Sequence, residues 1–234
     1  MARALVAEHE KRKSEESDSH HRQRLEALVA ERTQALERME RRLRVMMDGS
    51  IQALTAAVGT RDPYTAEHER RVANLACAIA TRMGLARDEV EGLRVMGFVH
   101  DLGKIAVPSE ILSKPGKLND FEFGLIKSHP QAGGGILSNI EFMWPIVQAT
   151  LQHHERLDGS GYPAGLRGDQ IIREARILAV ADVVEAMASH RPYRPALGID
   201  AALREIGERS GTQYDAEVVD ACSHVIRNEG FRFG

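Results

Sequence analysis

Apolar residues recur every three or four positions along most of this chain, which is the period of an α-helix with one buried face. In the segment 66–83, Val72, Leu75 and Ile79 share one side, and Gly84 follows as a helix stop. The same period predicts further helices at about 88–101, 142–154, 171–190, 199–209 and 215–228. No stretch alternates apolar and polar residues with the period of a strand, so we predict an all-α fold.

Shorter elements are predicted between these helices. Pro108 suits the start of a short helix, and Asn119 caps another that runs to His129 and Pro130. Three consecutive glycines at 133–135 are expected to interrupt helical structure, because glycine loses the most backbone entropy on entering a helix.

The first 50 residues have a different pattern. Up to His21 they are almost entirely polar and charged, which predicts a frayed helix or disorder. Beyond this point a repeat of alternating three and four residues continues for about four heptads, as in a coiled coil. Its positions are Leu25, Val29, Arg32, Leu36, Met39, Leu43, Met46, Ser50 and Ala53. Arg32 and Ser50 are polar flaws in this repeat.

We therefore divide the chain at residue 50. Residues 1–50 are predicted to form a polar tail and a coiled-coil helix for signalling and dimerisation, and residues 51–234 a helical domain. A parallel homodimer through the helix is favoured, and the alternative is a lone amphipathic helix folded back on its own domain. The stretch 26–33 resembles the linkers that join sensor and output domains, which predicts an upstream sensor domain.

The composition narrows the possible partners. Among 234 residues, 43% are hydrophobic and 28% charged, and the net charge of −3 lacks the basic surface that a nucleic-acid polymer requires. No apolar run is long enough for a membrane span, and the N-terminus has no apolar signal segment. Cys77 and Cys222 lie in apolar helical contexts and are expected to be small core residues in a reducing compartment. We therefore expect a cytoplasmic protein.

Histidines and aspartates near predicted helix ends are the candidate functional residues. His153 and His154 are adjacent, and neighbours on a helix point about 100° apart, so the two cannot face one core. At a helix end that opens onto a metal, both side chains can turn inward. Asp182 lies inside an apolar helical run, where a carboxylate is costly to bury unless a cation meets it. The full set is His68, His100, Asp101, His129, His153, His154 and Asp182.

Taken singly, two of these residues have ordinary structural explanations. His68 alone suits a hydrogen-bonded core histidine, and His129 alone suits a cation at a helix C-terminus. Taken together, imidazoles and carboxylates without thiolates favour Fe, Mn or Zn over sulfur-preferring metals. Seven ligands exceed the needs of one ion and suit two divalent ions that share a bridging aspartate. Such a pair activates water and binds phosphate, which predicts hydrolysis of a phosphate ester.

Three motifs are specific enough to indicate a family. Residues 100–104 read His-Asp-Leu-Gly-Lys, and residues 153–163 contain His-His-Glu followed by Gly-Tyr-Pro. Asp182 is followed by Arg-Pro-Tyr-Arg at residues 191–194. From about Ile51 to its end the chain resembles the HD-GYP domain, a branch of the HD-superfamily phosphohydrolases. The resemblance implies an HD-type helical bundle that hydrolyses the bacterial second messenger cyclic di-GMP to pGpG or GMP.

The resemblance also implies a role for each site residue. One Fe or Mn ion is held by His68, His100, Asp101 and Asp182, and the other by Asp101, His129, His153 and His154, with Asp101 bridging. Lys104 acts in catalysis by stabilising phosphate charge, and Arg191 and Arg194 bind the substrate phosphates. Tyr162 shapes the substrate pocket or contacts guanine, although a rigid turn at Tyr162 and Pro163 explains these residues equally well.

One position departs from the family pattern. Members with a third metal carry a glutamate one helical turn before the first histidine ligand, where this chain has Tyr64. A neutral phenol is a poor substitute, so we predict two ions. Glu67 is a weaker candidate for that role, because its side chain points elsewhere on the helix and suits a solvated face.

Two other functions compete with this one. A receptor that binds cyclic di-GMP or a protein partner without hydrolysis would signal through the coiled coil. The third possibility is an HD enzyme that acts on another nucleotide or phosphate ester, and the Gly-Tyr-Pro element argues against it. Every expected ligand of a two-ion site is present, which favours the phosphodiesterase.

Overall fold

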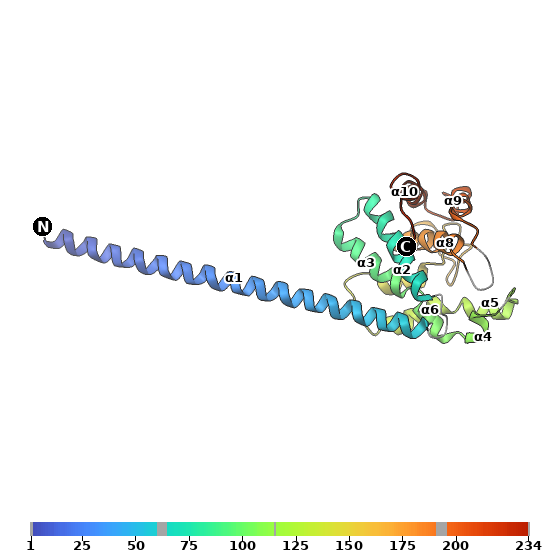
Figure 1. The fold of residues 1–234 in the computed structure, drawn as a ribbon, viewed down its shortest axis with the longest axis horizontal. Coiled ribbons are helices and arrows are strands. Elements are labelled where there is room, and N and C mark those ends of the chain that lie inside the picture. Colours follow the sequence, from blue (N-terminus) through green and yellow to red (C-terminus); the bar gives the residue numbers. More distant parts are fainter. Residues whose placement is uncertain (1, 60–64, 115, 191–195, 234) are drawn as a thin grey trace. The chain divides into compact units, whose positions relative to one another are not determined.

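The computed structural model describes residues 2–59, 65–114, 116–190 and 196–233 (Figure 1). The chain divides into two compact units, Met1–Ser50 and Ile51–Gly234. Across the described ranges the secondary structure consists of helices, with isolated β-bridges at Asp158–Arg167 and Ser210–Tyr214 in place of any strand. The predicted all-α class is confirmed.

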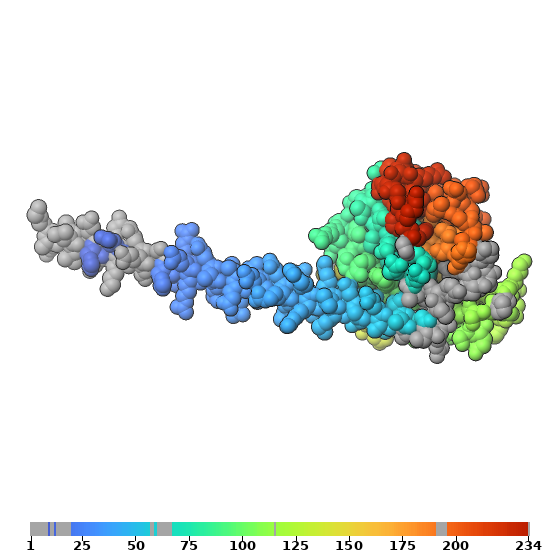
Figure 2. Space-filling view, in the orientation of Figure 1, coloured from blue at the N-terminus to red at the C-terminus, as the bar shows by residue number. Residues whose placement is uncertain are grey.

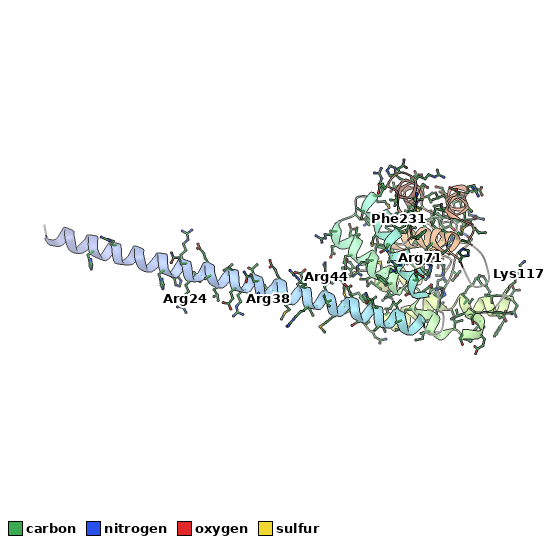
Figure 3. The ribbon with its side chains drawn as sticks, in the orientation of Figure 1. Arg24, Arg38, Arg44, Arg71, Lys117 and Phe231 are labelled. Atoms are coloured by element: carbon green, nitrogen blue, oxygen red, sulfur yellow. The ribbon has the colours of Figure 1, made fainter. Side chains whose placement is uncertain are left out.

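Helix α1 runs from Ala2 to Gly59 and makes up the described part of the first unit. Its polar stretch before His21 is helical as well. The side chains of Arg24, Arg38 and Arg44 are exposed on it (Figure 3). Large apolar side chains are also exposed, at Leu25, Leu28, Val29, Leu36, Met39, Leu43, Val45 and Met46. Six of these side chains, all except Leu28 and Val45, lie on the predicted repeat, and an exposed apolar row of this kind is what an unpaired coiled-coil helix presents. The coiled coil itself stays a prediction.

The second unit is a bundle of shorter helices. In chain order these are α2 (Thr65–Arg82), α3 (Arg87–Val99), η1 (Leu102–Ala106), α4 (Ser109–Leu112), α5 (Asp120–Ile126), α6 (His129–Leu137), α7 (Ile146–Gln152), η2 (Gly168–Gln170), α8 (Arg173–Ala188), α9 (Ile199–Glu208) and α10 (Ala216–Arg227). Helix α2 packs against α3, α8 and α10, and its predicted stripe of Val72, Leu75 and Ile79 is fully buried. Figure 2 shows α9 in orange and α10 in red side by side on one face.

Two packing features of the core determine where the site residues lie. A glycine allows α3 to approach α2 closely, because a Cβ on Gly97 would lie 2.5 Å from Ala73 Cα. Helix α8 is buried around most of its circumference, with Ile177, Leu178 and Val180 all inaccessible or nearly so. The carboxylates of Asp182 and Glu185, on the buried part of α8, therefore meet other protein groups and little water.

The prediction that the glycine triplet interrupts helical structure is wrong. All three glycines lie within α6. A Cβ on Gly133 would lie 3.0 Å from Thr150 Cγ2, and one on Gly134 2.8 Å from Leu151 Cδ2. The absent side chains let α6 pack closely on α7, and this packing outweighs the low helix propensity of glycine.

Two predicted boundaries also shift. The helix expected to run to His129 and Pro130 ends at Ile126, and His129 instead begins α6 with Pro130 in its first turn, a position that suits proline. His129 is therefore not a cation at a helix C-terminus. The helix expected from residue 142 begins only at Ile146.

Within the described part of the chain, no helix is both long and apolar enough to cross a membrane. The two cysteines are free thiols, Cys222 buried and Cys77 partly so. Burial raises the pKa of Cys77 to about 11 and that of Cys222 to about 12. Both thiols therefore stay protonated and weakly reactive near neutral pH.

Candidate metal centre

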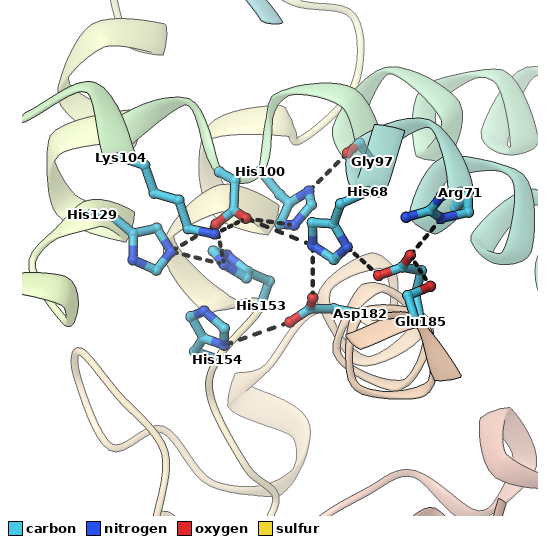
Figure 4. Close-up of polar contacts among 12 residues, drawn as sticks. His68, Arg71, Gly97, His100, Lys104, His129, His153, His154, Asp182 and Glu185 are labelled. Atoms are coloured by element: carbon cyan, nitrogen blue, oxygen red, sulfur yellow. Dashed lines mark hydrogen bonds and ion pairs between the residues drawn. The ribbon is translucent and has the colours of Figure 1, made fainter. Parts of the chain in front are cut away.

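All seven predicted metal ligands lie close together in the second unit (Figure 4). In each of two groups, one potential ligand atom from every member lies within 4.8 Å of the others. The groups are Asp101, His129, His153 and His154, and His68, His100 and Asp101. Asp182 borders both, since its Oδ1 lies 3.2 Å from His68 Nε2 and its Oδ2 lies 4.0 Å from His154 Nδ1.

Helix ends supply most of these side chains. His68 is in the first turn of α2, His100 and Asp101 directly follow α3, and His129 begins α6. His153 and His154 directly follow α7, whereas Asp182 comes from the interior of α8. His154 is the most accessible of the seven side chains, at 18%. The close packing of α2, α3 and α8 thus brings together residues that are far apart in sequence.

Three of the histidines are oriented by their own backbone. The Nδ1 atoms of His100, His129 and His153 each lie 2.7 Å from the carbonyl oxygen three residues earlier. A carbonyl oxygen only accepts, so each Nδ1 carries the proton. In a neutral imidazole this leaves Nε2 with a free lone pair directed toward the centre of the cluster.

The unprotonated Nε2 atoms of these rings lie close to one another, and none of them can donate a hydrogen bond to another. His129 Nε2 and His153 Nε2 are 3.2 Å apart, which brings two acceptors into contact. The buried His100 Nε2 has no hydrogen-bond partner among the described residues. Burying an acceptor without a hydrogen-bond donor costs free energy. A cation placed among the Nε2 atoms of His100, His129 and His153 would give all three lone pairs a partner. The residues therefore fit a divalent metal site.

The two oxygens of Asp101 face different histidines. Oδ1 lies 3.2 Å from His129 Nε2 and 4.0 Å from His153 Nε2. Oδ2 lies 3.5 Å from His100 Nε2 and 3.8 Å from His68 Nε2. A carboxylate placed between two sets of imidazoles has the geometry that a bridging ligand needs.

The protonation states also suit metal binding. Burial opposes ionisation of Asp101, but Lys104 and the nearby histidines outweigh it and hold the pKa of Asp101 well below its usual range. Burial likewise opposes ionisation of Asp182, and His68 and its neighbours lower its pKa well below the usual range. Burial lowers the pKa of His154 to about 3. Metals bind ionised carboxylates and neutral imidazoles, so these groups need no proton removed before they bind.

Comparison with known proteins identifies the family. Residues 23–218 match the HD domain family. The chain is 42% identical over 174 residues to the cyclic di-GMP phosphodiesterase response regulator RpfG of Xanthomonas campestris, a match that covers 74% of this chain and 46% of that protein. It is also 42% identical over 163 residues to the cyclic di-GMP phosphodiesterase PA4108 of Pseudomonas aeruginosa, covering 69% of this chain and 39% of that protein. The chain belongs to the HD domain family, in its HD-GYP branch.

A solved structure has the same fold. The cyclic GMP-AMP specific phosphodiesterase of Vibrio cholerae superposes on the HD-GYP chain with a TM-score of 0.59 at 19% sequence identity. The match covers 76% of this chain and 48% of the other. The HD-GYP chain thus spans less than half the length of these relatives.

One residue of the HD-GYP site was not among those predicted from the sequence. Glu185 lies one turn after Asp182 on α8 and is fully buried. Its carboxylate accepts hydrogen bonds from His68 Nδ1 at 2.5 Å, from Arg71 Nε at 2.6 Å and from Ser189 Oγ at 2.6 Å. Burial opposes its ionisation, but the bond from His68 and these other donors hold its pKa at about 2. Glu185 therefore fixes the ring of His68 with Nε2 toward the cluster, as carboxylates behind metal-binding histidines do.

We predict that Glu185→Gln weakens metal binding by roughly 10- to 100-fold, because an amide holds the His68 imidazole less firmly than a carboxylate does. Competition with a metal chelator, followed by metal analysis of the protein, measures this affinity. Glu174→Gln, in the first turn of the same helix, serves as the control and should bind metal like the native chain. Equal affinities in the two variants would contradict the role given to Glu185.

The predicted substrate-binding residues are only partly within the described ranges. Tyr162 lies beside the metal cluster, with its ring centroid 4.7 Å from that of His154. Arg191 and Arg194 lie outside the described residues, and their predicted contacts with substrate phosphates stay predictions. Tyr64 also lies outside them. Glu67 is exposed and pairs with Arg71 at 3.2 Å, as expected for a residue on a solvated face.

Proposed function

We propose that this HD-GYP chain is a metal-dependent phosphodiesterase that hydrolyses cyclic di-GMP to pGpG or GMP. The observation that carries the proposal is the position of Asp101, whose two carboxylate oxygens face separate sets of histidines. The substrate follows from the relatives, because two proteins 42% identical to this chain are named cyclic di-GMP phosphodiesterases.

Two divalent ions, Fe or Mn, are proposed as cofactors. His68, His100, Asp101 and Asp182 would hold one, and Asp101, His129, His153 and His154 the other. When bound, such a pair supplies activated water at neutral pH and stabilises negative charge on a phosphate. The imidazole and carboxylate ligands suit both Fe and Mn.

Among the described residues, Lys104 is a cation directly beside the proposed bridging aspartate. Its Nζ lies 2.5 Å from Asp101 Oδ2, and its side chain is 14% exposed. We propose that this ammonium group donates a hydrogen bond to a phosphate oxygen as negative charge develops there. Arg191 and Arg194 would bind the remaining phosphate oxygens, and Tyr162 would bound the pocket beside His154.

We predict that Lys104→Ala lowers kcat by roughly 10²- to 10³-fold, the usual cost of losing one donor that stabilises the transition state. Metal content should be unchanged, because none of the seven proposed ligands is removed. Steady-state kinetics and metal analysis on the same preparation test both parts. If the variant also loses its metal, Lys104 supports the ligands and does not act on the substrate.

A direct assay decides between hydrolysis and the receptor alternative. The chain is purified anaerobically, analysed for metal, and incubated with cyclic di-GMP under reducing conditions, with cyclic GMP-AMP as a comparison substrate. We expect about two ions per chain and the formation of pGpG or GMP. Binding of cyclic di-GMP without turnover, with either Mn or Fe loaded, would favour the receptor. A single ion per chain would overturn the two-ion arrangement.

We also propose that α1 forms a parallel homodimer and relays a signal from an upstream sensor domain. The apolar residues exposed along its heptad repeat support the dimer.

We predict that Leu43→Glu shifts the chain from dimer to monomer, because Leu43 is 60% exposed at a position of the repeat and a charge there is incompatible with a helix partner. Val45→Glu is the matched control, since Val45 is 66% exposed on α1 but lies off the repeat. Analytical ultracentrifugation over a range of concentrations distinguishes the two variants. If the native chain sediments as a monomer throughout, the dimer is wrong.

A further inference from the structure

Glu155 follows the histidine pair but has no role in the metal centre. Its side chain is buried, with 2% of the residue exposed. Oε1 accepts hydrogen bonds from the backbone N–H groups of Ala164 at 2.7 Å and Gly165 at 3.2 Å, and Oε2 accepts one from Leu166 at 3.0 Å. Three consecutive amides thus converge on one carboxylate, so Glu155 holds the backbone of the segment that follows Pro163.

The same segment is held at two further points. An isolated antiparallel bridge joins Asp158 to Arg167 at its base. At the start of the Gly-Tyr-Pro element, the N–H of Tyr162 donates to the carbonyl oxygen of His154 at 3.2 Å. Gly161 makes this approach possible, because a Cβ there would lie 2.5 Å from that same oxygen. We call residues 158–167 the GYP loop. Glu155 binds its second half through the amides of residues 164–166, and the bridge joins its two ends.

The GYP loop places an aromatic ring next to a proposed metal ligand. The rings of Tyr162 and His154 are tilted by 33° with their centroids 4.7 Å apart. Lys127 Nζ lies 5.3 Å from the centroid of the Tyr162 ring, within the range of a cation–π contact. Burial raises the pKa of Tyr162 above its ordinary value, so the ring is a neutral phenol. The result is a flat, partly apolar wall beside the metal cluster.

We propose that Glu155 is a positioning residue that sets substrate size selectivity, by holding the GYP loop so that Tyr162 stands beside His154. This rests on the proposed function. A cyclic dinucleotide extends well beyond its scissile phosphate and meets the Tyr162 wall, whereas a small phosphodiester reaches the metal cluster without that contact. Loss of the Glu155 bonds therefore affects the large substrate and spares the small one, because only the large one uses binding energy from this wall.

The test compares Glu155→Gln with the native chain on two substrates, cyclic di-GMP and bis(p-nitrophenyl) phosphate. We expect kcat/KM for cyclic di-GMP to fall on the order of 100-fold, mainly through KM. For the small diester kcat/KM should change less than about twofold, and metal content should be unchanged. Asp169→Asn is the matched control, because Asp169 is a fully exposed carboxylate outside the GYP loop.

Two further measurements test whether Glu155 acts by holding the GYP loop and through Tyr162. Hydrogen exchange of the amides of residues 164–166 should become faster in Glu155→Gln but not in Tyr162→Ala. Tyr162→Ala should show the same selective loss, and the double variant should lose no more than either single variant, because Glu155 acts through Tyr162. Additive losses, equal losses on both substrates, or unchanged exchange would each overturn the proposal. If the native chain does not hydrolyse cyclic di-GMP, the proposed function fails, and the exchange measurement still decides whether Glu155 holds the loop.

Discussion

Replacing Asp101 by alanine is expected to abolish hydrolysis of cyclic di-GMP and to remove bound metal in the same step. Asp101 is the residue common to both groups of potential ligands, and its two oxygens face His129 on one side and His100 on the other. Without it, Lys104 loses its carboxylate partner at 2.5 Å, and the two groups of imidazoles lose the carboxylate that lies between them. The loss in rate should exceed the roughly 10²- to 10³-fold expected for Lys104→Ala, because a whole site is lost and not one donor.

Metal analysis and turnover on one anaerobic preparation measure this result. Asp220→Ala provides a control, since Asp220 is an exposed carboxylate on α10. Asp101→Asn separates charge from size, and it too should bind metal weakly, because an amide oxygen is a poorer bridging ligand than a carboxylate. Retention of about two ions with turnover within tenfold of the native rate would exclude Asp101 as the shared ligand.

The second large effect is expected from Gly103→Ala. Gly103 lies in η1 where it contacts α6, and an added Cβ would collide with the backbone carbonyl of His129 and the backbone nitrogen of Gly133. Backbone atoms on both sides cannot rotate away, so η1 and α6 must separate. We expect a loss of about 3 kcal/mol in the free energy of unfolding, the upper part of the range for overpacking. Activity should fall by on the order of 100-fold, because the separation moves His129 relative to Asp101.

Gly135→Ala is the matched control for this substitution. Gly135 is exposed within the same helix α6, and a Cβ there would have nothing within 4 Å. Alanine has the higher helix propensity, so this variant should gain up to about 1 kcal/mol in stability. Denaturant unfolding of the two variants gives both values. A Gly103→Ala variant as stable as the native chain would show that η1 can move away from α6 without cost.

The clustering of the candidate ligands could be anticipated from the sequence better than the packing around them. Histidines and a buried aspartate at helix ends are types of residue that packing explains poorly, so Asp182 could be singled out from an apolar run alone. Glu185 directly follows the same run, and a carboxylate buried there needs a cationic or hydrogen-bonding partner just as Asp182 does. The partners of Glu155 could not have been predicted in this way, because they are backbone amides that only the fold brings to it.

The periodic spacing of apolar residues predicted a helix correctly where one face of that helix is buried. Helix α2 has the predicted stripe because Val72 and Leu75 meet the core. The period carries no information about close contact between backbones, which is why Gly133 and Gly134 were expected to break a helix that they instead allow to pack. The prediction relied on the low helix propensity of glycine, whereas the structure is determined by the close packing of α6 on α7.

The anchoring of the histidine rings has a consequence for how the site tolerates sequence change. His100, His129 and His153 are each oriented by a main-chain carbonyl, and every residue type at positions 97, 126 and 150 supplies one. His68 is oriented by a side chain, that of Glu185. Replacement of Glu185 can therefore release His68 directly, whereas replacement of Ile126 or Thr150 leaves in place the main-chain carbonyl that orients His129 or His153. Random substitutions in this protein would therefore be expected to disturb the orientation of His68 before that of the rings held by main-chain carbonyls.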